Sequence, residues 1–240
     1  MPVQAYTAAA LPRARTRAVG RRFGAGAALG VAVACAVALL LLWAIAEHVH
    51  AFEIRDTALL RDFTRLSGPH VGPVCEVLLH LLSPIVFTIW GFGLVLIALR
   101  RERPRVAAAV VGLMSLAPLC SEVLKRVLAH PHVSVGWTHI GAASFPSGHA
   151  TAATALALSV ALVSPARLRP LVATCGAAFM LVIGIALLIR EWHLPSDVLG
   201  GYLMGVLWAA LAVAAVRASE RRWPRRARDV DAAHDATILS

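Results

Sequence analysis

The sequence predicts an all-α, polytopic membrane protein, with six transmembrane helices and an interfacial helix between the first and the second. Of its 240 residues, 59% are hydrophobic and 15% are charged, against roughly 45–50% and 25% in soluble domains. The mean hydropathy is +0.73. A soluble globule cannot bury that much apolar surface, and the composition also excludes disordered, collagen-like and disulfide-stabilised proteins.

Six apolar segments account for the predicted spans, since a spanning helix needs about 20 apolar residues. The first is expected to be retained, because its uncharged run is longer than the roughly 7–15 apolar residues of a signal peptide. The third reaches Leu128 only if Glu122 and Lys125 are tolerated near the membrane. The segments cover residues 23–46, 77–99, 106–128, 149–164, 171–189 and 198–216.

The connection at residues 47–72 has apolar residues near helical spacing with charges between them, which favours an amphipathic helix at the membrane interface. We therefore expect a basic cytoplasmic tail at 1–22, a six-span domain at 23–217 and a polar cytoplasmic tail at 218–240.

Most of the 23 basic residues lie in the two tails and in the loops between spans two and three and between four and five. The positive-inside rule then places both termini in the cytoplasm of a multi-pass plasma-membrane protein. Contact of these regions with anionic lipid accounts for the net charge of +10. No nucleic-acid partner is implied.

Titratable residues gather at the opposite, outer ends of spans three to six, in the stretches 124–132, 144–150 and 190–197. Ionisable groups beside hydrocarbon are costly and usually functional. Their collection at one end disfavours a transporter or channel, in which they would line a path. No ligand spacing supports a metal site.

The second stretch contains Pro146, Ser147, Gly148 and His149. Proline and serine suit the start of a helix, glycine allows close approach of a ligand, and helix N-termini bind anions. His149 adds a proton donor, so the motif suits a phosphate whose leaving oxygen must be protonated. The alternative is an ordinary helix cap with an interfacial histidine.

His193 and Asp197 are separated by Pro195, which can start the next helix. A carboxylate that orients an imidazole can make it nucleophilic toward phosphorus. The alternative is a capping aspartate and an interfacial histidine. Lys125 is the only lysine. It either neutralises phosphate oxygens or is a snorkelling anchor paired with Glu122.

Together these stretches resemble the type 2 phosphatidic acid phosphatase superfamily of integral membrane lipid phosphatases, which has six spans. Its sequence elements are Lys-x6-Arg-Pro, Pro-Ser-Gly-His and Ser-Arg-x5-His-x3-Asp. Lys125 fits the first, residues 146–149 complete the second, and His193 with Asp197 completes the end of the third. The resemblance covers about residues 56–216.

The resemblance implies that His193 is the nucleophile, Asp197 its orienting partner and His149 the acid. It implies no metal or other cofactor. The implied phosphate-binding residues are Lys125, Ser147 and Gly148.

Two arginines of the family pattern are missing, because His132 and Leu187 occupy their positions. Arg190, nearly one helical turn beyond Leu187, is expected to reach the same phosphate. The alternative is a snorkelling anchor. A protonated His132 could replace the other arginine, which would raise activity below neutral pH. The alternative is an ordinary loop histidine.

The expected function is a membrane phosphohydrolase, acting on a polyprenyl or glycerolipid phosphate or diphosphate at the outer face through a phosphohistidine intermediate. Two alternatives remain open: a non-catalytic membrane protein that binds lipid phosphate, and a lipid phosphotransferase.

Overall fold

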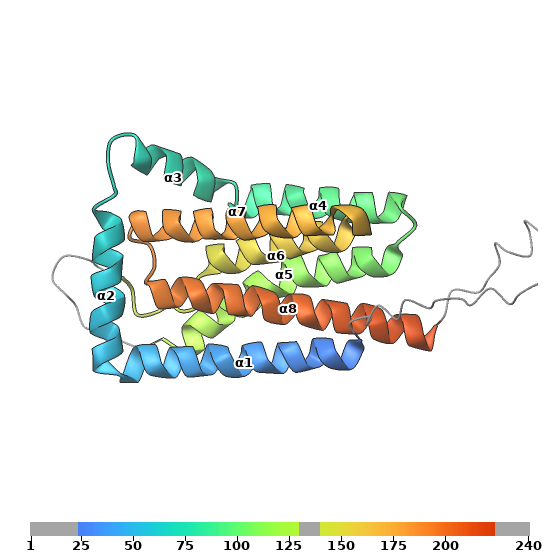
Figure 1. The fold of residues 1–240 in the computed structure, drawn as a ribbon, viewed down its shortest axis with the longest axis horizontal. Helices are drawn as coiled ribbons and strands as arrows, with labels where there is room; N and C mark the ends of the chain where they lie inside the picture. The colour runs from blue at the N-terminus through green and yellow to red at the C-terminus, as the bar shows by residue number, and fades with distance from the viewer. Residues whose placement is uncertain (1–23, 130–139, 224–240) are drawn as a thin grey trace, which may run out of the picture.

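The computed structural model describes residues 24–129 and 140–223, and every regular element within them is helical (Figure 1). The all-α prediction is confirmed for this part of the chain. The elements are α1 (Ala25–His48), α2 (His50–Thr64), α3 (Val71–His80), α4 (Pro84–Arg100), α5 (Pro104–Val127), α6 (Gly148–Val163), the 3₁₀ turn η1 (Ala166–Leu168), α7 (Arg169–Ile189) and α8 (Pro195–Arg222).

Several helices are long and apolar enough to cross a membrane, so the chain is a multi-pass membrane protein. Helices α1, α5 and α8 each meet this requirement, and so does α7 when the preceding turn η1 is counted with it. The bent pair α3 and α4 makes a fifth if it counts as one span. Helix α6 is apolar but only 16 residues long. By length and composition the described residues therefore contain four or five spans, and six remains a prediction.

The continuous span expected at residues 77–99 is replaced by two helices. Helix α3 ends at His80, α4 begins at Pro84, and the two axes differ by 51°. Proline lacks a backbone N–H and its ring clashes with the carbonyl four residues earlier, so it starts a new helix more readily than it continues one. Hydropathy alone did not reveal this break.

Helix α6 lies at the centre of the bundle, in contact with α4, α5, α7 and α8. Its packing against α8 depends on small residues. A Cβ atom on Gly201 would lie 2.6 Å from the Ser147 carbonyl oxygen, and one on Gly205 would collide with Thr154. The two backbones can approach this closely only because both positions are glycine.

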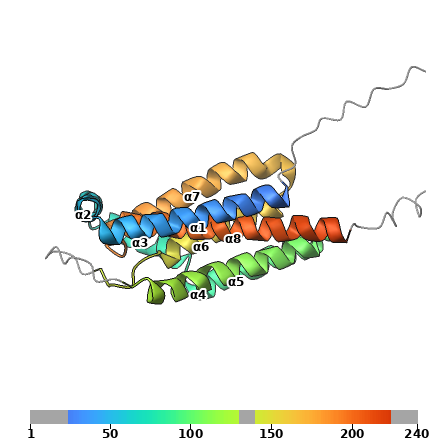
Figure 2. The same ribbon diagram turned by 90° about the horizontal axis from the view of Figure 1, so that it is seen from below.

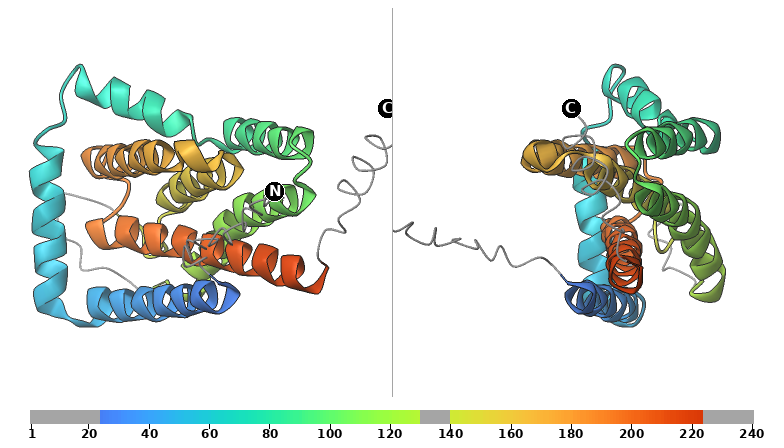
Figure 3. Two further views of the ribbon diagram at one scale, coloured as in Figure 1. Left: turned by 45° about the vertical axis from the view of Figure 1, so that its right-hand side comes forward. Right: turned by 90° about the vertical axis from the view of Figure 1, so that its right-hand side faces the viewer.

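Helix α2 lies across one end of the bundle, between the C-terminus of α1 and the start of α3 (Figures 1 and 3). It packs on α1, α7 and α8. Leu60 is fully buried, whereas the flanking Arg61 and Asp62 are not. A helix is therefore present where the sequence predicted one, and its amphipathic role at a membrane interface remains a prediction.

The start of α1 and the end of α8 lie at the other end of the bundle from α2 (Figures 1 and 2). That both termini lie on one side of the membrane remains a prediction. The cytoplasmic identity of that side rests on the distribution of basic residues.

Candidate active site

The stretches that sequence analysis singled out meet at the α2 end of the bundle. Ser121 on α5 donates its hydroxyl hydrogen to the Pro146 carbonyl oxygen over 3.1 Å. The backbone N–H of Ser147, ahead of α6, donates to the carbonyl oxygen of Asp197 on α8 over 2.9 Å. Hydrogen bonds thus join the C-terminal part of α5 to the N-termini of α6 and α8.

Ser147 is the N-cap of α6. Its hydroxyl oxygen accepts the Ala150 N–H over 3.3 Å, and its carbonyl oxygen accepts the Thr151 hydroxyl over 2.8 Å. The serine is fully buried. The amides of the first turn have no intrahelical carbonyl to bind, so a capped N-terminus still offers donors to an anion.

Lys125 and Glu122 lie directly over Gly148. The Lys125 Nζ atom is 2.7 Å from Oε1 of Glu122. A Cβ atom on Gly148 would lie 2.8 Å from that same oxygen and 3.3 Å from the Lys125 Nζ atom. Glycine therefore permits this close approach. The snorkelling pair and the phosphate-site lysine, which the sequence offered as alternatives, are compatible in this geometry.

His193 and Asp197 form a buried pair at the start of α8. The Nδ1 atom of His193 lies 3.4 Å from Oδ2 of Asp197, which also accepts the Leu194 N–H over 2.9 Å. Asp197 is 1% exposed. Contact at Nδ1 leaves the Nε2 atom of His193 available to a substrate, as nucleophilic attack requires.

The turn between α7 and α8 determines where His193 lies. Glu191 adopts a left-handed conformation with φ of 56°. The N–H of Trp192 donates to the Leu187 carbonyl oxygen and that of Glu191 to the Leu188 carbonyl oxygen, each over 3.1 Å. This pair of bonds is the Schellman ending of a helix, which usually carries glycine at the left-handed position. Glutamate there gave no sequence signal for the turn.

His149 lies on the first turn of α6 and faces the same region. His193, Lys125 and Glu122 are all close enough to interact with it electrostatically. Its ring centroid is 5.5 Å from that of Trp192, with the ring planes at 59°. The candidate acid and the candidate nucleophile thus come together from two helix N-termini.

Arg190 extends toward α3. Its Nη2 atom lies 3.8 Å from Oε2 of Glu76, and its Nη1 atom would be 3.4 Å from a Cβ on Gly72. The Nε atom is buried and has no hydrogen-bond partner among the described residues. Leu187, at the position of the missing family arginine, is fully buried in an apolar cluster with Leu60.

His132 lies outside the described residues. Within residues 24–129 and 140–223, no group of three or more His, Cys, Asp or Glu side chains is arranged to hold a metal ion.

Sequence analysis missed Asp56 on α2. Its carboxylate is buried and accepts hydrogen bonds from Ser196, immediately before Asp197. One signal was available: Asp56 falls four residues after Phe52 and four before Leu60, in the apolar row of an otherwise amphipathic helix.

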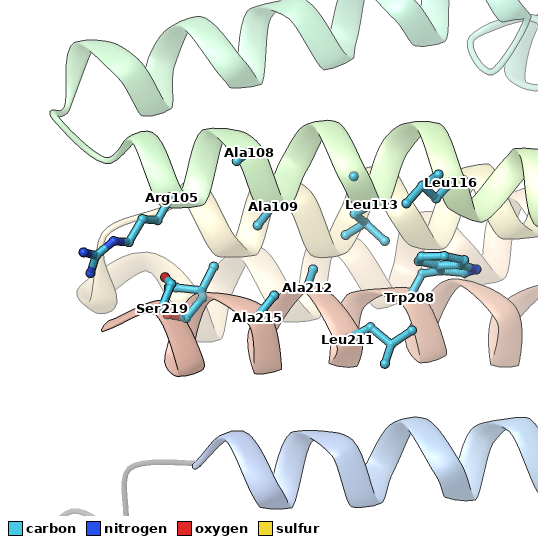
Figure 4. A pocket seen from close by; sticks show the side chains of 12 residues that line it. Arg105, Ala108, Ala109, Leu113, Leu116, Trp208, Leu211, Ala212, Ala215 and Ser219 are labelled. Atoms are coloured by element: carbon cyan, nitrogen blue, oxygen red, sulfur yellow. Dashed lines mark hydrogen bonds between the residues drawn. The ribbon is translucent and has the colours of Figure 1, made fainter. Parts of the chain in front are cut away.

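A separate hollow of about 440 Å³ lies between α5 and α8 (Figure 4). Arg105 and Ser219 stand at one end of it, and Leu116 and Trp208 at the other. Its walls are otherwise alanine, leucine, valine and glycine. The lining of the hollow therefore contains no histidine, carboxylate or cysteine side chain.

Known proteins share this fold. A family model described as the PAP2 superfamily matches residues 78–221. The crystal structure of a transmembrane PAP2-type phosphatidylglycerolphosphate phosphatase from Bacillus subtilis superposes with a TM-score of 0.64 at 21% identity, covering 81% of this chain and 98% of that one. LpxE from Aquifex aeolicus gives a TM-score of 0.52 at 18% identity, covering 65% and 93%. No curated protein sequence matches significantly.

Proposed function

This chain belongs to the PAP2 superfamily, and we propose that it is a membrane phosphohydrolase that removes phosphate from a lipid phosphate or diphosphate. One observation carries the proposal. The buried His193–Asp197 pair stands at the same end of the bundle as His149, Lys125 and the capped N-terminus of α6. A nucleophile, an acid and an anion site are thus assembled from separate elements.

In the proposed reaction, Nε2 of His193 attacks phosphorus and the bond from phosphorus to the leaving oxygen breaks. His149 gives its proton to that oxygen, which leaves as the lipid alcohol or, from a diphosphate, as the lipid monophosphate. Water then attacks the phosphohistidine, gives a proton to His149 and releases inorganic phosphate with free His193. Asp197 holds Nδ1–H and stabilises the imidazolium that forms.

The phosphate would be bound by Lys125 and by the first-turn amides of α6, against which Gly148 presents no side chain. Because the Ser147 hydroxyl caps the helix, its contribution is to fix those donors. Arg190 would join them by turning away from Glu76, and His132 would supply a further donor when protonated.

The substrate would be a polyprenyl phosphate or diphosphate, phosphatidic acid or phosphatidylglycerophosphate. Its apolar tail stays in the bilayer while its headgroup reaches the α2 end of the bundle. We place that end at the outer face of the plasma membrane, because the basic tails and loops belong to the opposite side.

One observation favours the non-catalytic alternative, in which the chain only binds lipid phosphate. Leu187 packs in an apolar cluster where the family pattern has an arginine that would stabilise charge. Losing one such donor can lower the rate about 10²–10³-fold. A loss of that size would leave a slow enzyme, not an inactive one. A phosphotransferase would instead pass the phosphoryl group to an acceptor other than water.

The test is phosphate release by detergent-solubilised protein from a panel of these lipids, in EDTA. His193→Ala is the test variant, and His80→Ala, which changes an exposed histidine outside the site, is the matched control. We expect release by the wild type and His80→Ala only. Lipid binding without release from any substrate would favour the binding protein, and a phosphorylated acceptor would favour the transferase.

A further inference from the structure

The buried carboxylate of Asp56 is bonded to the helix that carries Asp197. Its Oδ1 atom accepts the Ser196 N–H over 3.1 Å, and Oδ2 accepts the Ser196 hydroxyl over 2.6 Å. Asp56 is 7% exposed. The two residues are 140 positions apart, so this contact joins α2 directly to the candidate catalytic segment.

Helix α8 needs this carboxylate because its own N-cap residue is Leu194, whose side chain cannot accept a hydrogen bond. The free amides at a helix N-terminus favour a negative charge. Two carboxylates meet the need: Asp197 binds the Leu194 N–H and Asp56 binds the Ser196 N–H. A buried carboxylate without such partners would be strongly unfavourable.

The contact also fixes the segment on which His193 lies. On one side of His193, the Schellman turn ends α7. On the other, only Leu194 and Pro195 separate it from Ser196. Leu60, one turn after Asp56 on α2, packs in the same apolar cluster as Leu187 and Leu194. Helix α2 therefore holds both ends of the short loop that presents His193.

We infer that Asp56 is a positioning residue, which keeps His193 and Asp197 in reactive geometry by holding the N-terminus of α8 against α2. The inference rests on the proposed function for its kinetic consequence. A displacement of about 1 Å at a reacting group can cost about 100-fold in rate. Asp56 would therefore affect kcat much more than KM, because its hydrogen bonds to Ser196 act on the segment that carries His193 and Asp197.

The kinetic test compares Asp56→Ala, Asp56→Asn and Ser196→Ala with Asp62→Ala. Asp62 is an exposed aspartate on the same helix, paired with Arg65. We expect kcat to fall about 10–100-fold in Asp56→Ala with KM nearly unchanged. Asp56→Asn should recover part of the loss, since its amide oxygen can still accept the Ser196 N–H. Equal kcat in Asp56→Ala and Asp62→Ala would overturn the inference.

Two further measurements separate positioning from general destabilisation and from failure of the proposed function. Thermal unfolding of each variant corrects kcat for the folded fraction, and a loss that disappears after this correction contradicts the inference. The rate at which diethyl pyrocarbonate modifies His193, followed by mass spectrometry with His80 as internal reference, needs no activity. We expect faster modification of His193 in Asp56→Ala. An unchanged rate would overturn positioning, even if the wild type released no phosphate.

Discussion

The backbone N–H of Ser147 donates to the carbonyl oxygen of Asp197 over 2.9 Å, so the N-termini of α6 and α8 are hydrogen-bonded to each other. His149 lies on the first turn of α6, and His193 immediately precedes α8. The separation of the two candidate catalytic histidines therefore depends on how closely these helices pack. A change between α6 and α8 should act on both histidines together.

Gly201→Ala should reduce both stability and activity. Its Cβ would lie 2.6 Å from the Ser147 carbonyl oxygen and 2.7 Å from the Cβ of Ala150, and neither atom belongs to a flexible side-chain end. Overpacking of this kind costs about 1–3 kcal/mol. Thermal unfolding and phosphate release should both be measured.

Gly93→Ala on α4 is the matched control, because nothing lies within 4 Å of a Cβ at that position. We expect it to leave both quantities unchanged. Wild-type activity and stability in Gly201→Ala would show that the two helices can separate without harm.

Asp197→Asn should abolish most of the activity while preserving the fold. The amide oxygen of asparagine can still accept the Leu194 N–H, so the end of α8 stays capped. Loss of the charge removes the orientation and stabilisation of the imidazolium. In the serine protease triad, the corresponding change lowers kcat about 10⁴-fold. Single-turnover measurement of phosphate release, beside circular dichroism of the variant, tests this expectation. A loss of less than tenfold would argue that Asp197 serves only as a cap.

The apolar segments and the motif residues were predictable because both are local properties of the sequence. A run of apolar residues reports that a helix is buried in lipid or protein, but not which of the two surrounds it. For this reason α6 was predicted as a helix, but its position at the centre of the bundle was not predicted. Its buried Thr151, Thr154 and Ser159 reflect that central position. The motif containing Gly148 was recognisable for the same reason.

The contacts that align the site were not predictable, since they join residues far apart in the chain. The Asp56–Ser196 contact spans 140 residues. The turn at Glu191 is equally hidden, because a non-glycine residue in the left-handed region gives no compositional signal. At Leu187 the sequence did carry the information, because it showed that the arginine of the family pattern is replaced by leucine. The structure adds that this leucine is buried in an apolar cluster.

Glu122→Gln should lower KM for a lipid phosphate with little change in kcat. The Glu122 carboxylate lies 2.7 Å from the Lys125 Nζ atom and also interacts with His149. It therefore competes with an incoming phosphate for the same cation. Because Glu122 is 59% exposed, the gain should be modest and should shrink as salt is raised.

Glu220→Gln removes a carboxylate that pairs with Arg217 near the other end of α8 and serves as the control. A higher KM in Glu122→Gln alone would reverse the interpretation, because it would mean that Glu122 holds Lys125 in its binding position.

Arg190→Ala and Glu76→Gln should change activity in opposite directions if Arg190 replaces the missing family arginine. Arg190 lies 3.8 Å from Glu76, a half-exposed pairing that water and salt weaken. Removing the Glu76 carboxylate frees the guanidinium to turn toward the phosphate, so kcat/KM should rise. Removing Arg190 should lower it about 10²–10³-fold, as loss of one charge-stabilising donor does. The double variant decides the matter, since it should behave like Arg190→Ala alone. If Glu76→Gln and Arg190→Ala are each neutral, Arg190 is a surface anchor, and the phosphate charge is neutralised without it.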